Sequence, residues 1–177
     1  GHTVHVLDAV PGLPDMVYAA NGAFSVDGAV YGARFRYPER AAEADAHAAF
    51  YGLGSWRFAG PVHVNEGEGD FAYLPAAYGG LVLAGYGFRT DPAAHAEAQE
   101  ILGRPVLSLR LVDPAFYHLD TALAALDDRT IAYYPGAFSA ASQRVLAQLF
   151  PDAVIADRAD AEAFGLNLVS DGRHVIL

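Results

Sequence analysis

The sequence predicts an α/β fold that is built from repeated modules with the order strand, turn, strand, helix, strand. Short apolar runs occur in pairs around turn dipeptides, and Ala-rich segments with helix start and stop signals follow them. A polar residue also recurs before each pair at intervals of 55, 50 and 47 residues, at Asp15, Asp70, Asp120 and Asn167. A period of this size is typical of a repeat architecture, in which each module buries its apolar faces against neighbours. An ordinary α/β domain with chance similarity between its segments is the alternative.

The first part of the chain predicts one separate strand and one complete module. Residues 2–10 alternate in polarity and predict a strand, which Pro11-Gly12 ends. Two dipeptides are typical of tight hairpins, because both central residues of a type I′ turn take positive φ. These are Asn21-Gly22 and Asp27-Gly28, of which the second is the stronger prediction. The remaining elements expected here are apolar runs at 16–20, 23–26 and 29–33, a helix at 39–50 and a strand at 56–64.

Two further modules follow, and then the first half of another. The second module is expected to contain strands at 71–74, 81–86 and 106–111 and a helix at 93–102, capped by Thr90-Asp91-Pro92 and ended by Gly103. The third is expected to contain strands at 121–126, 130–134 and 153–156 and a helix at 140–150 that Ser139 caps. Residues 159–164 are expected to be helical or turn-like, and residues 167–177 to form a last hairpin.

The length of 177 residues suits a single domain. Both ends of the sequence are strand-like, whereas the ends of natural domains are usually polar and exposed. We therefore expect residues 1–177 to be the central part of a larger ring, with three whole modules and incomplete modules at the N- and C-terminal ends. A complete protein that has been processed or tagged is the alternative.

The composition excludes several classes of function. The formal net charge of −10 and the pI of about 4.9 argue against nucleic acid, although an acidic protein attracts cationic small molecules. No signal peptide or apolar stretch long enough to cross a membrane is present, so a cytoplasmic protein is expected. Because the chain contains no cysteine, disulfides, thiolate metal sites and a cysteine nucleophile are impossible within these residues. The histidines are not clustered either, so no metal site is expected.

A histidine and an aspartate lie two residues apart in Tyr117-His118-Leu119-Asp120-Thr121. In an extended strand, residues two apart face the same side, so we expect the side chains of His118 and Asp120 to share one space. A histidine transfers protons near neutral pH, and a carboxylate holds a cation. The pair therefore predicts a site for a cationic substrate.

Four motifs occur in order along the chain: Leu13-Pro14-Asp15-Met16-Val17-Tyr18, Asn65-Glu66-Gly67-Glu68-Gly69-Asp70, Gly87-Phe88-Arg89-Thr90 and Tyr117-His118-Leu119-Asp120-Thr121. Together they resemble the guanidino-group-modifying superfamily, which contains dimethylarginine dimethylaminohydrolases, arginine deiminases, arginine dihydrolases and amidinotransferases. The resemblance covers essentially the whole chain. It implies a pentein fold, an α/β propeller of five modules around a central site, of which this chain would form a partial ring.

The resemblance also implies covalent chemistry without a cofactor. A cysteine near the C-terminus attacks the guanidinium carbon, a histidine and a carboxylate move protons, and further carboxylates hold the cation. The expected activity is hydrolysis of arginine or N-methylated arginine, and that cysteine would lie beyond Leu177. An amidinotransferase, or an arginine dihydrolase or deiminase, is the nearer alternative. A non-catalytic binder of cationic amino acids is the alternative from another class.

The resemblance gives each candidate residue an expected role. His118 would act as general acid and base with Glu66 as its partner, although Glu68 is an alternative partner because the motif is one residue longer than usual. Asp120 and Asp15 would hold the guanidinium, and Asp70 would make a structural or secondary substrate contact.

Further expected contacts concern the other end of the substrate. Arg89 would bind the substrate carboxylate, or would instead pair with Asp91 at the surface. Asn21 resembles an asparagine of the dihydrolase subgroup, or is simply a turn residue. Arg36 and Arg40 would close over the site or lie at the surface. The expected partner is a small molecule, arginine or methylarginine, and pairing of two subunits into a homodimer is left open.

Overall fold

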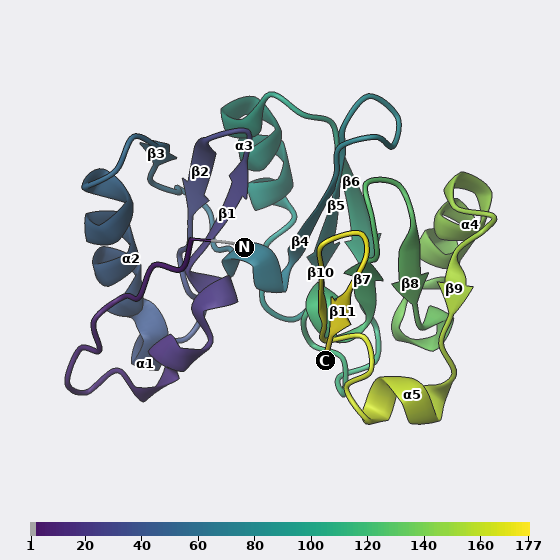
Figure 1. Ribbon diagram of the computed structural model, residues 1–177. Helices are drawn as coiled ribbons and strands as arrows, with labels where there is room; N and C mark the ends of the chain where they lie inside the picture. Colours follow the sequence, from purple (N-terminus) through teal and green to yellow (C-terminus); the bar gives the residue numbers. More distant parts are fainter. Residues whose placement is uncertain (1–2) are drawn as a thin grey trace.

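The computed structural model describes residues 3–177, and within them the same small sheet occurs three times (Figure 1). In each sheet the first two strands are antiparallel and the third runs parallel to the second. The strands are β1 (Ala23–Val26), β2 (Ala29–Gly32) and β3 (Arg57–Ala59), then β4 (Phe71–Leu74), β5 (Leu81–Tyr86) and β6 (Val106–Arg110), then β7 (Leu123–Ala125), β8 (Ile131–Tyr133) and β9 (Val154–Ile155). The mixed α/β modules that the sequence predicts are therefore present as a row of open sheets.

Each parallel connection contains a helix, as a crossover between parallel strands requires. The helices are α1 (Pro38–Ala41) and α2 (Glu43–Gly52) in the first module, α3 (Ala93–Leu102) in the second, α4 (Ala140–Leu149) in the third, and α5 (Arg158–Glu162) after it. Ser139 caps α4 by accepting a hydrogen bond from the Ser142 amide at 3.3 Å, as predicted. The predicted cap of α3 is wrong, because α3 has no side-chain cap and the Thr90 hydroxyl donates to Asp70 instead.

The two hairpin predictions have opposite outcomes. Asp27 and Gly28 take φ of 49° and 79° and join β1 to β2, as predicted. Asn21 and Gly22 instead end the 3-10 helix η2 (Ala19–Gly22), which follows the 3-10 helix η1 (Pro14–Val17). The apolar run at 16–20 is therefore not a strand, since Pro14 starts a helical turn and the Asn21 side chain bonds to distant residues.

The predicted strand at 2–10 is also wrong for its described part. Residues 3–10 form no strand, and Val4 and Val6 are more than 80% exposed, because no neighbouring strand pairs with them. The predicted helix at 39–50 is divided at Ala42 into α1 and α2. The strand expected at 56–64 is shortened to β3, and the last hairpin is reduced to β10 (Val169–Ser170) and β11 (Val175–Ile176).

The 3-10 helices η3 (Gly67–Gly69) and η4 (Leu119–Thr121) precede β4 and β7. The residue just before the first strand of each sheet has a carbonyl that accepts a hydrogen bond from an amide at the end of the second strand. These carbonyls belong to Gly22, Asp70 and Ala122. When the modules are aligned on these three carbonyls, Asp120 takes the same place as Glu68, and Asp70 takes the same place as Ala122. The alignment of Asp70 with Asp120 was therefore wrong, because Asp70 immediately precedes β4, whereas Asp120 lies within η4, two residues further from its strand β7.

Neighbouring modules bury their apolar faces against one another. One cluster joins Phe24 and Tyr31 of the first sheet to Phe71 and Val82 of the second. A larger cluster joins the second and third modules and includes Leu83, Leu109, Ile131 and Phe138. Within residues 3–177, no helix is long and apolar enough to cross a membrane.

We expect the substitution Phe138→Ala to destabilise the protein by about 3–5 kcal/mol, because it leaves a cavity in the larger cluster. Phe138 is 1% exposed, whereas Phe164, its matched control, is 63% exposed. Urea unfolding followed by circular dichroism measures both variants. Equal losses of unfolding free energy in Phe138→Ala and Phe164→Ala would contradict this account of the core.

Candidate active site

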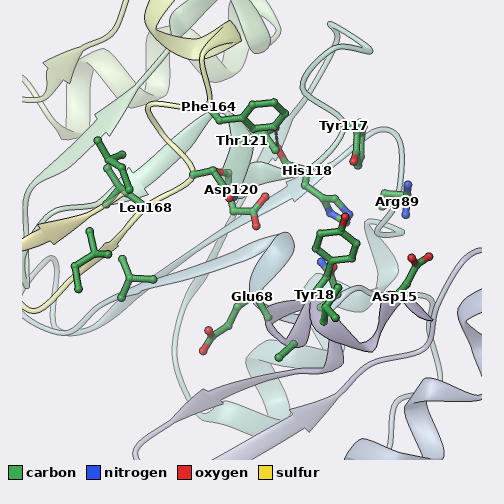
Figure 2. A pocket seen from close by; sticks show the side chains of 18 of the residues that line it. Asp15, Tyr18, Glu68, Arg89, Tyr117, His118, Asp120, Thr121, Phe164 and Leu168 are labelled. Atoms are coloured by element: carbon green, nitrogen blue, oxygen red, sulfur yellow. Dashed lines mark hydrogen bonds between the residues drawn. The ribbon is translucent and has the colours of Figure 1, made fainter. Parts of the chain in front are cut away.

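A cavity of about 730 Å³ opens where the 3-10 helices meet the C-terminal hairpin. Its wall contains the acidic side chains of Asp15, Glu68 and Asp120 and the basic side chains of Arg89 and His118 (Figure 2). The polar lining residues are Asp15, Asn21, Arg40, Glu68, Arg89, His118, Asp120, Thr121 and Asn167. Figure 2 shows the Asp15 and Asp120 carboxylates on different sides of His118.

His118 lies on the cavity wall between two buried carboxylates. It is the extended residue just before η4, with φ of −119° and ψ of 155°, and is 6% exposed. Its Nε2 lies 3.2 Å from Glu66 Oε2, and its Nδ1 lies 3.3 Å from Asp70 Oδ2. The contact with Glu66 is within hydrogen-bonding range, whereas Nδ1 faces Asp70 at ion-pair distance without the direction of a hydrogen bond.

A hydroxyl and a backbone amide hold the Asp70 carboxylate and connect it to the backbone of Glu66. The Thr90 hydroxyl donates to Asp70 Oδ2 at 2.7 Å and accepts from the Glu66 amide at 3.2 Å. The Leu119 amide donates to Asp70 Oδ1 at 3.1 Å. Thr90 therefore connects both partners of His118, and Leu119 ties Asp70 to the start of η4.

Burial alone would lower the pKa of His118, but the contacts with Asp70 and Glu66 outweigh it and raise the pKa to about 9. Burial alone would raise the pKa of Glu66, yet His118 and Arg89 lower it overall. Near neutral pH the site therefore contains an imidazolium flanked by two carboxylates.

These charges predict how stability depends on pH. Since the pKa of His118 is higher in the folded chain than its ordinary 6.5, its stabilisation is complete below pH 6.5 and is lost as pH rises through 9. Wild-type protein should lose up to about 3 kcal/mol more unfolding free energy than His118→Gln between pH 6 and pH 9.5. Urea unfolding at both pH values measures this difference, and parallel losses would contradict the ion-pair assignment.

Asp120 and Glu68 occupy matching positions in η4 and η3 and face the cavity. Burial raises the pKa of Asp120 to about 6. Both residues also line a second cavity of about 280 Å³ between β1, β4 and β7. Together with Leu168 and Val169, which also line both cavities, they form the boundary between them.

Arg40, Asn21 and Asp15 form a second polar group at the cavity. Arg40 makes two bonds to Glu43, at 2.9 and 2.7 Å, and donates to Asn21 Oδ1 at 2.9 Å. It also donates to the Asp15 carbonyl at 3.2 Å, and its guanidinium lies 4.6 Å from the Phe35 ring centroid. Arg40 thereby links η1 and η2 to α2 and fixes this side of the cavity.

The structure brings most of the candidate residues to one place. Asp15, Asn21, Arg89, His118 and Asp120 line the cavity. Glu66 and Asp70 are buried behind His118 and are not part of the cavity wall. His118 and Asp120 do share one space, but through a 3-10 turn rather than the extended strand that was predicted.

Some contacts differ from the expectations or were missed. Arg89 pairs with Glu66 at 2.8 Å, and Asp91 pairs with Arg36, so the predicted alternative of an Arg89–Asp91 pair is wrong. Sequence reasoning missed the role of Thr90. It also missed the link from Arg40 to Glu43, for which the spacing of three residues within a helical segment was the available signal. Among the described residues, no group of three or more His, Asp or Glu side chains could hold a metal ion.

Comparison with known proteins finds several relatives of this chain. No family model matches the chain. The chain is 56% identical over all 177 residues to N(G),N(G)-dimethylarginine dimethylaminohydrolase of Mycobacterium tuberculosis, of which it covers 57%. The chain is therefore similar to members of the guanidino-group-modifying superfamily. Within this superfamily, it is also 33% identical over 98% of its length to the bifunctional arginine dihydrolase/ornithine cyclodeaminase ArgZ of Synechocystis, of which it covers 25%.

Solved structures of the superfamily have the same fold. The N-terminal domain of ArgZ, crystallised with its substrate as a cysteine-to-serine mutant, superposes with a TM-score of 0.90 at 33% identity. That match covers 94% of this chain and 62% of the ArgZ domain. A dimethylarginine dimethylaminohydrolase from Pseudomonas aeruginosa superposes with a TM-score of 0.72 at 18% identity over 93% of this chain and 61% of that protein, and this likeness concerns the fold alone. The chain thus spans about three fifths of the length of each of these two solved structures.

Proposed function

We propose that this chain forms most of the active site of a hydrolase that cleaves a C–N bond at the guanidinium carbon of arginine or an N-methylated arginine. The observation that carries the proposal is the position of His118, held between Glu66 and Asp70 on the wall of a cavity that also contains Asp120 and Arg89. The 56% identity to a relative named dimethylarginine dimethylaminohydrolase supports the substrate class.

The charges of the cavity suit both ends of an arginine-type substrate. Asp120 and Asp15 offer carboxylates to the planar guanidinium, which carboxylates bind through pairs of hydrogen bonds. Arg89 and Arg40 offer guanidinium groups to the α-carboxylate of the substrate. Asn21 lies beside Arg40 and contributes an amide to the same wall.

In the proposed mechanism, a thiolate attacks the guanidinium carbon, and the protonated His118 donates its proton to the nitrogen that leaves as an amine. His118 then accepts a proton from the water molecule that attacks the same carbon, and the thiolate departs as the ureido product forms. Glu66 orients His118 and stabilises its positive charge. The 177 residues contain no cysteine, so the proposal assigns the nucleophile to sequence outside them.

We further propose that the three open sheets and the β10–β11 hairpin are consecutive modules of a five-module propeller, with residues 1–177 as its central part. The repeated order of strands and helices and the burial between neighbouring modules support this arrangement. A cytoplasmic location and pairing of subunits stay predictions.

Two alternatives have support from particular observations. Relatives named arginine dihydrolase favour a second hydrolysis, in which arginine yields ornithine, carbon dioxide and two molecules of ammonia. Asn21 on the cavity wall is the residue that we would expect to favour this second step. The lack of cysteine within these residues favours a binder of cationic amino acids. An amidinotransferase would transfer the amidino group to an amine, whereas a hydrolase transfers it to water.

Product analysis of the natural protein that contains this sequence separates these functions. Asymmetric dimethylarginine should yield citrulline and dimethylamine in equal amounts, measured by mass spectrometry. Formation of ornithine from arginine would assign a dihydrolase, and a new guanidino compound in the presence of glycine would assign a transferase. Tight binding of arginine without any product would overturn the hydrolase proposal in favour of the binder.

A further inference from the structure

Arg89 lies between two aromatic rings, at the edge of the cavity. Its guanidinium carbon is 4.8 Å from the Tyr37 ring centroid and 4.7 Å from the Tyr117 ring centroid. Both distances are within the range of cation–π contacts. The Arg89 carbonyl also accepts a hydrogen bond from Arg36 Nε at 2.8 Å. The guanidinium is therefore held at one position on the cavity wall.

One carboxylate oxygen connects Arg89 to His118. Glu66 Oε2 lies 2.8 Å from Arg89 Nη1 and 3.2 Å from His118 Nε2, so the two cations share the same acceptor. Glu66 is fully buried, and its other oxygen accepts a backbone bond from Arg36 N at 3.2 Å. A change of charge at Arg89 must therefore change how strongly Glu66 attracts the proton of His118.

Arg89 also faces the cavity, since 21% of its side chain is exposed and it is part of the wall. An anion that enters the cavity can thus reach Arg89 while Glu66 stays buried. We propose that Arg89 is a positioning residue that couples recognition of the substrate carboxylate to the proton affinity of His118 through Glu66. The ligand part of this proposal rests on the proposed function, whereas the link from Arg89 to His118 does not.

The sign of the coupling follows from the charges. The positive charge of Arg89 competes with His118 for Glu66, so neutralising Arg89 leaves more negative charge for His118 and raises its pKa. A substrate carboxylate bound to Arg89 acts in the same direction. The other charged groups that face His118, Asp70 from the entry of β4 and Asp120 from η4, are unchanged by this step. Carboxylate binding therefore keeps His118 protonated for donation to the leaving amine.

NMR titration of the histidine side chains tests the link without any ligand. The His118 signal is identified by its loss in His118→Gln. In Arg89→Met the midpoint of the His118 titration should rise by about one pH unit, which is a typical effect of one close charge. Arg89→Lys keeps the charge and should give a smaller rise. Arg104→Met removes an arginine that pairs with Asp27 away from the cavity, at 2.7 Å, and should leave the midpoint unchanged.

A comparison of two ligands tests the coupling in the wild-type protein. Agmatine carries the amine and guanidinium of L-arginine but lacks its carboxylate. The midpoint for His118 should be higher with saturating L-arginine than with saturating agmatine, and Arg89→Met should abolish that difference. A purely structural role of Arg89 would not produce a difference that depends on the ligand carboxylate.

Each result is decisive for one part of the account. An unchanged His118 midpoint in folded Arg89→Met overturns the link through Glu66. If that variant does not fold, equal midpoints with arginine and agmatine in the wild-type protein overturn the coupling. If neither ligand binds, the proposed function fails, while the titration without ligand still decides whether Arg89 controls His118.

Discussion

His118→Gln should lower kcat by about 10²–10⁴-fold, the range that one general acid–base group contributes. Glutamine is similar in size and can bond to Glu66, but it neither donates a proton to the leaving amine nor accepts one from water. The affinity for arginine should change little, because the proposed contacts with the guanidinium come from Asp120 and Asp15. Steady-state kinetics with asymmetric dimethylarginine measures kcat, and calorimetric titration with arginine measures Kd.

The control for this variant is His63→Gln, a substitution at an exposed histidine outside the cavity wall. It should keep wild-type kcat and Kd. Full turnover in His118→Gln would remove His118 from the mechanism. A large loss of arginine affinity with unchanged kcat would instead make His118 a binding residue.

Asp120→Asn should weaken binding of arginine by about 30-fold or more, because loss of one partner from a desolvated charge pair costs about 2–5 kcal/mol. Burial raises the pKa of Asp120 to about 6, so the wild-type affinity should also fall as pH decreases below 6 and the carboxylate gains a proton. His118, with a pKa of about 9, stays charged over this range, so its titration does not contribute to the dependence of arginine affinity on pH.

Calorimetric titrations between pH 5 and pH 8 measure both effects. The variant should show weak binding and little dependence on pH over that range. Asp152→Asn replaces an exposed aspartate and should behave as the wild-type protein does. Wild-type affinity in Asp120→Asn, or the same decrease below pH 6 in that variant, would show that another group binds the guanidinium.

Local signals in the sequence explain the parts of the fold that were predicted well. Asp27-Gly28 can form a type I′ hairpin without help from the rest of the chain, and Gly103, with φ of 62°, ends α3 where the sequence predicts. Asn21-Gly22 has the same local preference as Asp27-Gly28. Its asparagine is held in η2 by Arg40 and by the Glu66 carbonyl, which is a tertiary effect that no local pattern contains.

The site was predicted mainly through the resemblance, because its contacts are far apart in sequence. No spacing rule indicates that Glu66 lies against His118, since the two residues come from different modules. Sequence alone assigned Thr90 to a helix cap, a common role of threonine, whereas its hydroxyl joins Glu66 to Asp70. Arg89 was expected either at the substrate or at the surface, and the structure places it against Glu66 between two tyrosines.

The central claim is that a water molecule replaces an amine at the guanidinium carbon in the cavity beside His118. Its most direct test is the reaction of asymmetric dimethylarginine in water enriched in oxygen-18, with the natural protein that contains this sequence and with its His118→Gln variant. We expect citrulline that carries one heavy oxygen in its ureido group, released with an equal amount of dimethylamine, and very little product from the variant. Unlabelled citrulline, or the same product from both proteins, would contradict it.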